Sequence, residues 1–173
     1  MVNHVRYLNL EETRQKDSDV ENMLNNGLAK EIAEDLLYRT GVALAQDDAD
    51  AFVSCFFFPQ MIETANGARV VESPDELKQI FFKVRDHHRS TGITNLVRAI
   101  VSAEFSEADV IYSTHVSHHL DVSGIPAGKP YPALSVLRQK DGEWKIEASI
   151  YALLDDPSMN EALELRGTEK SDA

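Results

Sequence analysis

Residues 96–122 read LVRAIVSAEFSEADVIYSTHVSHHLDV, and apolar residues alternate with polar ones along most of this stretch. Alternation with a period of two is the pattern of β-strands that bury one of their faces. The pattern continues as YPALSVLRQ over residues 131–139 and as EWKIEASIYALL over residues 143–154. The sequence therefore predicts four long antiparallel strands between residues 96 and 154.

Two dipeptides mark tight turns between strands. Asn66-Gly67 lies in the middle of MIETANGARVVE (residues 61–72), and Asp141-Gly142 separates the last two long strands. Asn-Gly and Asp-Gly readily adopt the positive φ angles of short hairpin turns. We therefore expect a small hairpin around residue 66 and a tight hairpin at residue 141.

Three helices are predicted before the long strands. Apolar residues at helical spacing indicate an amphipathic helix over residues 28–46, and Asp48 is placed to cap a short second helix. Residues 73–76 read SPDE, a capping box with proline at the first helical position, so a third helix begins there. Helices first and antiparallel strands afterwards are typical of an α+β fold.

The two ends of the chain differ from this central part. Residues 1–28 have few apolar residues at helical spacing and are expected to form an N-terminal arm. Residues 155–173 carry two basic against six acidic residues and are expected to form a solvated acidic tail with at most one short helix. The predicted domain covers residues 29–154.

Composition and charge exclude several classes of partner. The 173 residues include 17 Lys and Arg against 29 Asp and Glu, a net charge of −12, and no cluster of basic residues that would bind nucleic acid or an anionic membrane. Cys55 is the single cysteine, so an internal disulfide is excluded. The N-terminal residues lack the apolar stretch of a signal peptide, and we therefore predict a cytoplasmic location.

Three stretches resemble the nuclear-transport-factor-2-like superfamily, which includes ketosteroid isomerase and the SnoaL-like cyclases. ALAQDDADAFVSCF (residues 43–56) resembles the junction of the family's first two helices. SPDELKQIF (residues 73–81) resembles its capped third helix, and KDGEWKI (residues 140–146) resembles its final hairpin. With the order of elements, the similarity covers about residues 29–154.

This resemblance implies a strongly curved, mixed sheet whose concave face is closed by about three helices to form a conical pocket. It also implies a homodimer through the convex face. Because Val110, Tyr112, Val116 and His118 belong to the more apolar face of their strand, we expect that face to line the pocket. In the last strand the matching residues would be Trp144, Ile146, Ala148 and Ile150. The convex face of the sheet would then carry Ile100, Ile111 and Tyr151.

The residues that carry ketosteroid isomerase chemistry in the family are not matched here. Thr40 stands where the family has a tyrosine, Thr64 stands beside Glu63 where the family has its carboxylate base, and Val136 stands near the position of its acid. The standard reaction is therefore excluded. Glu63 remains a candidate as a displaced base, and Thr40 and Tyr112 remain candidates for orienting a ligand.

Histidines are the other candidates for acid–base chemistry. His88 continues the apolar stripe of the third helix, and His118 shares the predicted inner face with Tyr112. A neutral imidazole with a pKa near 6.5 is suited to proton transfer at neutral pH. His115 and His119 lie about 13 Å apart along one strand, too far for one zinc ion, so neither a metal nor any other cofactor is predicted.

Two kinds of function remain open. One is a small-molecule pocket that binds a small apolar or aromatic ligand, or acts as a cofactor-independent lyase or isomerase on a small carbonyl or hydroxy compound, with His88 and His118 as acid and base. The other is a non-catalytic protein of the same shape, either a dimeric interaction module or a scaffold like the small subunit of a ring-hydroxylating dioxygenase. The inward-facing histidines favour the first function, and the missing family catalysts favour the second.

Overall fold

The chain forms four helices and six strands in the residues that the computed structural model describes, 3–153 and 157–164. The α+β class predicted from the order of the elements is confirmed. In chain order the elements are α1 (Asn3–Ala45), α2 (Ala49–Val53), β1 (Phe56–Thr64), β2 (Gly67–Val71), α3 (Pro74–Ser90), β3 (Asn95–Glu107), β4 (Val110–Leu120), β5 (Tyr131–Lys140), β6 (Glu143–Tyr151) and α4 (Pro157–Glu164).

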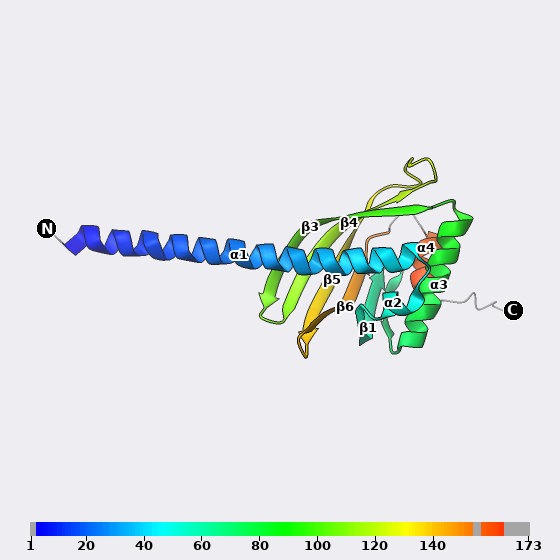
Figure 1. Cartoon of the computed structure of the whole chain (residues 1–173), viewed down its shortest axis with the longest axis horizontal. Helices are drawn as coiled ribbons and strands as arrows, with labels where there is room; N and C mark the ends of the chain where they lie inside the picture. Colours follow the sequence, from blue (N-terminus) through cyan, green and yellow to red (C-terminus); the bar gives the residue numbers. More distant parts are fainter. Residues whose placement is uncertain (1–2, 154–156, 165–173) are drawn as a thin grey trace.

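All six strands belong to one mixed sheet in the order β2-β1-β6-β5-β4-β3. Strands β1 and β6 run parallel, and every other neighbouring pair is antiparallel. Helix α1 crosses the sheet and packs against β3, while α3 and α4 pack together at the end of the sheet that holds β1 (Figure 1). We call the face covered by these helices the inner face and the opposite one the outer face.

Local sequence signals place several element boundaries. The Ser73 hydroxyl accepts a hydrogen bond from the Glu76 amide at 3.3 Å, and the Asp48 carboxylate accepts one from the Ala51 amide at 2.9 Å. These are the predicted N-caps of α3 and α2. Asp141 and Gly142 have φ angles of 53° and 82°, as a tight hairpin turn requires, so the turn predicted between β5 and β6 is confirmed.

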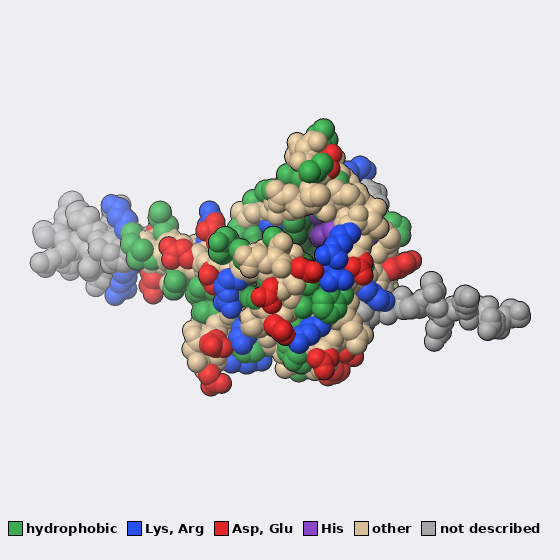
Figure 2. Space-filling model, turned by 45° about the vertical axis from the view of Figure 1, so that its right-hand side comes forward, with side chains coloured by type: hydrophobic (Ala, Val, Ile, Leu, Met, Phe, Trp, Pro, Cys, Tyr) green, Lys and Arg blue, Asp and Glu red, His purple; other side chains and the backbone are tan. Residues whose placement is uncertain are grey.

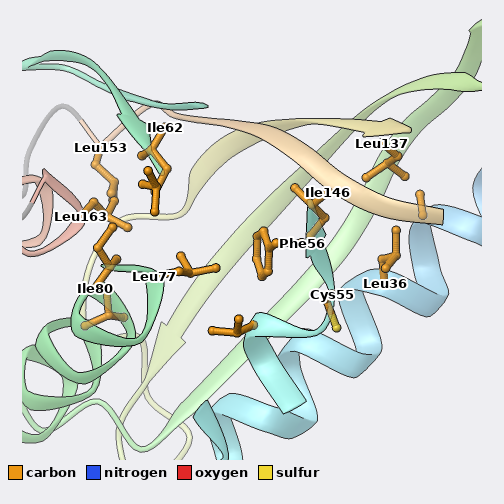
Figure 3. Packing of buried hydrophobic residues seen from close by; sticks show 14 of the residues in the cluster. Leu36, Cys55, Phe56, Ile62, Leu77, Ile80, Leu137, Ile146, Leu153 and Leu163 are labelled. Atoms are coloured by element: carbon orange, nitrogen blue, oxygen red, sulfur yellow. The ribbon is translucent and has the colours of Figure 1, made fainter. Parts of the chain in front are cut away.

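The hydrophobic core lies between the helices and the inner face. Leu77 of α3 lies beside Phe56 of the sheet, Leu36 of α1 lies on the side of Leu137, and Leu163 of α4 lies near Ile62 (Figure 3). Leu36 and Leu77 are each 2% exposed. Burial of apolar surface by α4 extends the core beyond the predicted domain limit at residue 154.

Both ends of the chain differ from the prediction. Helix α1 begins at Asn3 rather than near residue 28 and extends well beyond the sheet (Figure 1). The tail is not simply solvated, because Met159 and Leu163 of α4 are buried at 4% and 5% exposure; the rest of it, residues 165–173, lies outside the described residues. Although α1 has 43 residues, no described helix is both long and apolar enough to cross a membrane.

Two leucines on α1 allow a matched test of this packing. Leu36 is 2% exposed and belongs to the core, whereas Leu24 is 70% exposed on the part of the helix beyond the sheet. Leu36→Ala should lower the free energy of unfolding by about 2–5 kcal/mol, because it leaves a cavity. Leu24→Ala, the same exchange on the same helix, should change it by less than about 0.5 kcal/mol. Urea denaturation measures both, and equal losses would show that the N-terminal part of α1 is packed.

Candidate functional site

Strand β4 presents its histidine and serine residues to the inner face. Ser113, His115, Ser117 and His119 are all buried, whereas Tyr112 is 49% exposed. The predicted face of this strand is therefore wrong, and His118 and Tyr112 lie on the outer face. The prediction assumed that the more apolar face turns inward, but here the histidine and serine face of β4 forms one side of a cavity whose other lining residues are mainly apolar.

Strand β6 changes face part of the way along its length. Leu137 pairs with Ile146 and Val136 pairs with Ala148, so Glu147 is an extra residue that forms a β-bulge. Ile146 faces inward before the bulge, and Ser149 and Tyr151 line the inner cavity after it. The predicted inward face is thus correct for Ile146 and wrong beyond the bulge, because one inserted residue reverses the alternation.

Two hollows lie between the helices and the inner face. The outer groove has a volume of about 740 Å³ and runs between the C-terminal half of α1, the end of α3 and the first part of β3. The inner cavity has a volume of about 90 Å³ and lies deeper, against the inner face of the sheet. Six residues line both hollows and form their junction: Leu37, Leu44, His88, Leu96, Arg98 and Ile100.

Arg98 brings a positive charge to this junction. Its position on β3, opposite Ser117, turns its side chain toward the inner face, where its Nη2 donates a hydrogen bond to the Leu37 carbonyl at 2.6 Å. A Cβ at Gly41, one turn further along α1, would lie 2.7 Å from Nη2. The absence of a side chain at residue 41 therefore makes room for the guanidinium.

Two titratable groups near Arg98, His115 and Tyr151, are held in their neutral forms. Burial, together with the charge of Arg98, lowers the pKa of His115 to about 4, so its ring is neutral at pH 7. Burial raises the pKa of Tyr151, although a hydrogen bond with Ser149 and the Arg98 charge oppose the shift. Burial also lowers the pKa of Arg98 from 12.5, but a guanidinium remains charged at neutral pH. Arg98 is therefore a permanent cation near two neutral groups of the inner cavity, His115 and Tyr151.

The wall of the inner cavity is rich in hydroxyl and amide groups. It includes Ser113, Ser117, Ser135 and Ser149 from three neighbouring strands, and Gln60 from β1. Gln60 is 1% exposed, and its Nε2 lies 3.5 Å from the Ser149 hydroxyl. Its Oε1 has no hydrogen-bond partner in the described part of the chain. A buried acceptor of this kind is unfavourable unless something donates to it.

A row of rings connects the groove to the inner face. The ring of His88 lies 5.0 Å from that of His119, and the His119 Nε2 lies 3.3 Å from the Tyr131 hydroxyl. Histidine and basic side chains are seen next to each other at the surface of this part of the molecule (Figure 2). Within the described residues, no group of three or more His, Cys, Asp or Glu side chains is arranged to hold a metal ion.

The structure brings two of the five predicted site residues to the hollows. His88 lines both, and Thr40 lines the inner cavity with its hydroxyl bonded to the Leu36 carbonyl at 2.9 Å. Glu63 is exposed on the β1–β2 hairpin, away from either hollow. His118 and Tyr112 are on the outer face, so the geometry does not support a place for them in a pocket.

Sequence reasoning missed Arg98, His115 and Gln60. One signal was present in LVRAIV, where Arg98 is two residues from both Leu96 and Ile100 and therefore shares their face. A second was Gly41 in the interior of a predicted helix, where glycine is unfavourable by about 1 kcal/mol relative to alanine. Neither signal reveals by itself that the two residues meet, because they come from elements far apart in sequence.

Comparison with solved structures identifies the architecture. A nuclear-transport-factor-2-like protein with a cystatin-like fold from Novosphingobium aromaticivorans has a TM-score of 0.58 and 16% identity, over 84% of this chain and 95% of the other. The chain has the cystatin-like fold of nuclear-transport-factor-2-like proteins. This bears out the resemblance in the three sequence stretches as far as the fold is concerned.

Two further structures support the same assignment. A ketosteroid isomerase-like protein from Erwinia carotovora atroseptica has a TM-score of 0.55 and 16% identity, over 71% of this chain and 94% of the other. A protein of unknown function from Shewanella oneidensis has a TM-score of 0.57 and 14% identity, over 70% of this chain and 97% of the other. No family model and no curated protein matches the sequence. Identities this low show the fold and leave the activity to be argued from the site.

The lowered pKa of His115 predicts a pH dependence of stability. Its folded value of about 4 lies below the ordinary value of 6.5, so the unfolded chain binds more protons between these two values. His115 therefore contributes stability that is complete above about pH 6.5 and is lost as the pH falls toward 4. His115→Gln should reduce this loss by up to about 3 kcal/mol, measured by urea denaturation across the range.

Thr114→Ala provides the control, because it alters the neighbouring position of β4 without removing a titratable group. Its pH slope should equal that of the wild type. A His115→Gln protein with an unchanged slope would show that His115 is not held neutral in the fold.

Proposed function

We propose that the chain binds a small organic molecule with a carbonyl or hydroxyl oxygen in the inner cavity. The observation that carries this proposal is the buried Gln60 amide, which lines the cavity and whose Oε1 has no partner in the described residues. Native proteins rarely leave a buried polar atom unsatisfied, and ligand sites combine apolar walls with a few convergent polar groups. The serine-rich wall and the charged junction complete such a set.

The size of the inner cavity restricts what it can hold. A cavity of about 150 Å³ binds benzene, whereas this one measures about 90 Å³. An aromatic ring would therefore extend into the outer groove, and a compact aliphatic molecule is the better occupant of the cavity itself. The lining is mainly apolar, and the serine and glutamine side chains on its strand side favour a ligand that also carries a polar group.

Acid–base chemistry on that ligand, of the lyase or isomerase type, is the finer part of the proposal. His88 lies at the junction of the groove and the cavity, and its ring packs edge to face against His119, whose Nε2 lies 3.3 Å from the Tyr131 hydroxyl. A histidine that lines the cavity can exchange a proton with a ligand bound there. His88, rather than His118, is thus the residue that we propose to exchange a proton with the ligand.

Nuclear magnetic resonance titration with 2-butanol and 2-butanone tests the proposed binding. Both should shift the side-chain amide signals of Gln60 and the ring signals of His115 in the millimolar range. Ser113→Val should abolish these shifts, because its larger side chain enters the cavity, whereas Thr114→Val on the outer face should preserve them. In D₂O, His88→Gln should slow deuterium uptake beside the butanone carbonyl. If neither compound shifts these signals in the wild-type protein, the proposed pocket is refuted.

We also propose a homodimer through the outer face of the sheet. The sequence predicted Ile100, Ile111 and Tyr151 on this face, and the structure contradicts all three: Ile111 is buried in the core, and Ile100 and Tyr151 line the inner cavity. The outer face instead exposes Val97 and Tyr112, which lie on the neighbouring strands β3 and β4. Exposed apolar side chains on one sheet face are suited to a two-fold contact.

Light scattering tests the dimer. The wild type should have twice the 19.3 kDa mass of one chain, and Val97→Glu with Tyr112→Glu should return it to the monomer mass. Val122→Glu, at an 86% exposed loop residue, should leave the dimer intact. A wild-type monomer would contradict this interface.

A further inference from the structure

Arg98 differs from other arginines of the chain in having no carboxylate beside it. Arg138 lies 2.7 Å from the Glu147 carboxylate, and Arg85 lies 3.2 Å from that of Asp47. Among the described residues, the Leu37 carbonyl is the acceptor recorded for Arg98, and no acidic side chain pairs with it. A guanidinium has five N–H donors, and Arg98 lines both hollows while one of its nitrogens donates to the Leu37 carbonyl.

Arg98 is half-buried and lines the open groove, so its charge is only partly removed from water. A partly desolvated charge is still less favourable without an opposite charge beside it. No such charge comes from the described residues of this chain. An anion that enters from solvent would compensate it, and a carboxylate matches the planar fork of a guanidinium with two parallel hydrogen bonds.

Helix α1 has room for the Arg98 guanidinium because residue 41 is glycine. Glycine inside a helix is intrinsically unfavourable, yet Gly41 lies in the interior of α1, directly against Nη2 of Arg98. Any side chain at this residue would displace the end of the arginine. Glycine at residue 41 thus lowers the helix propensity of α1 and, in return, leaves the Arg98 guanidinium in its place at the junction.

Gln60 is the second residue that would contact the ligand. It lines the same cavity as Arg98, is 1% exposed, and its Oε1 lacks a donor in the described residues. A carboxylate cannot donate to this oxygen, but a hydroxyl group on the same molecule can. The two polar groups therefore call for different functional groups on one small ligand.

We infer that the occupant of the inner cavity is a small hydroxy acid, whose carboxylate pairs with Arg98 and whose hydroxyl donates to Gln60. This inference rests on the proposed small-molecule pocket and names the chemical class of its ligand. The cavity of about 90 Å³ has the volume of about three waters at about 30 Å³ each, which suits a skeleton of few carbons. The net charge of −12 opposes an anion only weakly, because salt screens exposed charges beyond about 8 Å.

Three probes with the same three-carbon skeleton separate the two contacts. Lactate has the carboxylate and the hydroxyl, propionate has only the carboxylate, and propane-1,2-diol has hydroxyls without charge. Titration followed by nuclear magnetic resonance at the Gln60 amide and the Arg98 Nε–H should show that lactate binds most tightly, propionate more weakly and the diol most weakly. Arg98→Gln should weaken lactate binding about tenfold or more, as expected for a charge-assisted pair.

Three variants complete the test. Gly41→Ala keeps the arginine but displaces its guanidinium, so lactate should bind more weakly to a fully folded protein. Gln60→Leu should reduce the affinity for lactate to that for propionate. Arg39→Gln removes an exposed arginine of α1 that pairs with Asp35, and serves as the control for loss of one charge. It should bind lactate like the wild type.

The failures of the two proposals are distinguishable. If the diol or 2-butanol binds to the wild type as tightly as lactate, and Gly41→Ala and Arg98→Gln leave lactate binding unchanged, the hydroxy acid is refuted and the pocket remains. If none of these probes, nor 2-butanone, perturbs the Gln60 amide, both proposals are refuted. If Arg98→Gln does not fold, the order of affinities for the three probes in the wild type and the affinity of Gly41→Ala for lactate decide whether the ligand is a hydroxy acid.

Discussion

The hydrogen bond from Arg98 to the Leu37 carbonyl joins helix α1 to strand β3, at the point where the two hollows meet. A side chain at residue 41 would displace the guanidinium, so this contact depends on Gly41. The small inner cavity lies deeper than the contact, and the open groove lies outside it. The same contact places a positive charge where the two hollows meet, so the packing of the helix and the chemistry of the site share one interaction.

Much of the fold could be predicted from the sequence because its signals are local. The caps at Asp48 and Ser73 and the turn at Asp141 act within a few residues, and the structure has them where the sequence puts them. Strand alternation likewise identified the long strands. The ends of the chain were harder, since the length of α1 and the burial of Leu163 in α4 depend on contacts with distant residues.

The candidate site was predicted less well for a physical reason. Alternation tells which residues of a strand share a face, but the choice of the inward face assumes an apolar interior. In β4 that assumption fails, because His115 and Ser117 face the inner cavity while Tyr112 faces outward. In β6 the bulge at Glu147 reverses the alternation, and nothing in the local sequence marks it. The partnership of Arg98 and Gly41 links residues on different elements, which a single sequence does not pair.

A crystal structure of the protein grown with lactate tests the central claim most directly. We expect the carboxylate of the ligand within hydrogen-bond distance of the Arg98 guanidinium, and the hydroxyl of the ligand within the same distance of Gln60 Oε1. We also expect His115 and Ser117 on the inner face and His118 on the outer face. An Arg98 side chain that pairs with a protein carboxylate, or a ligand bound away from it, would contradict the account.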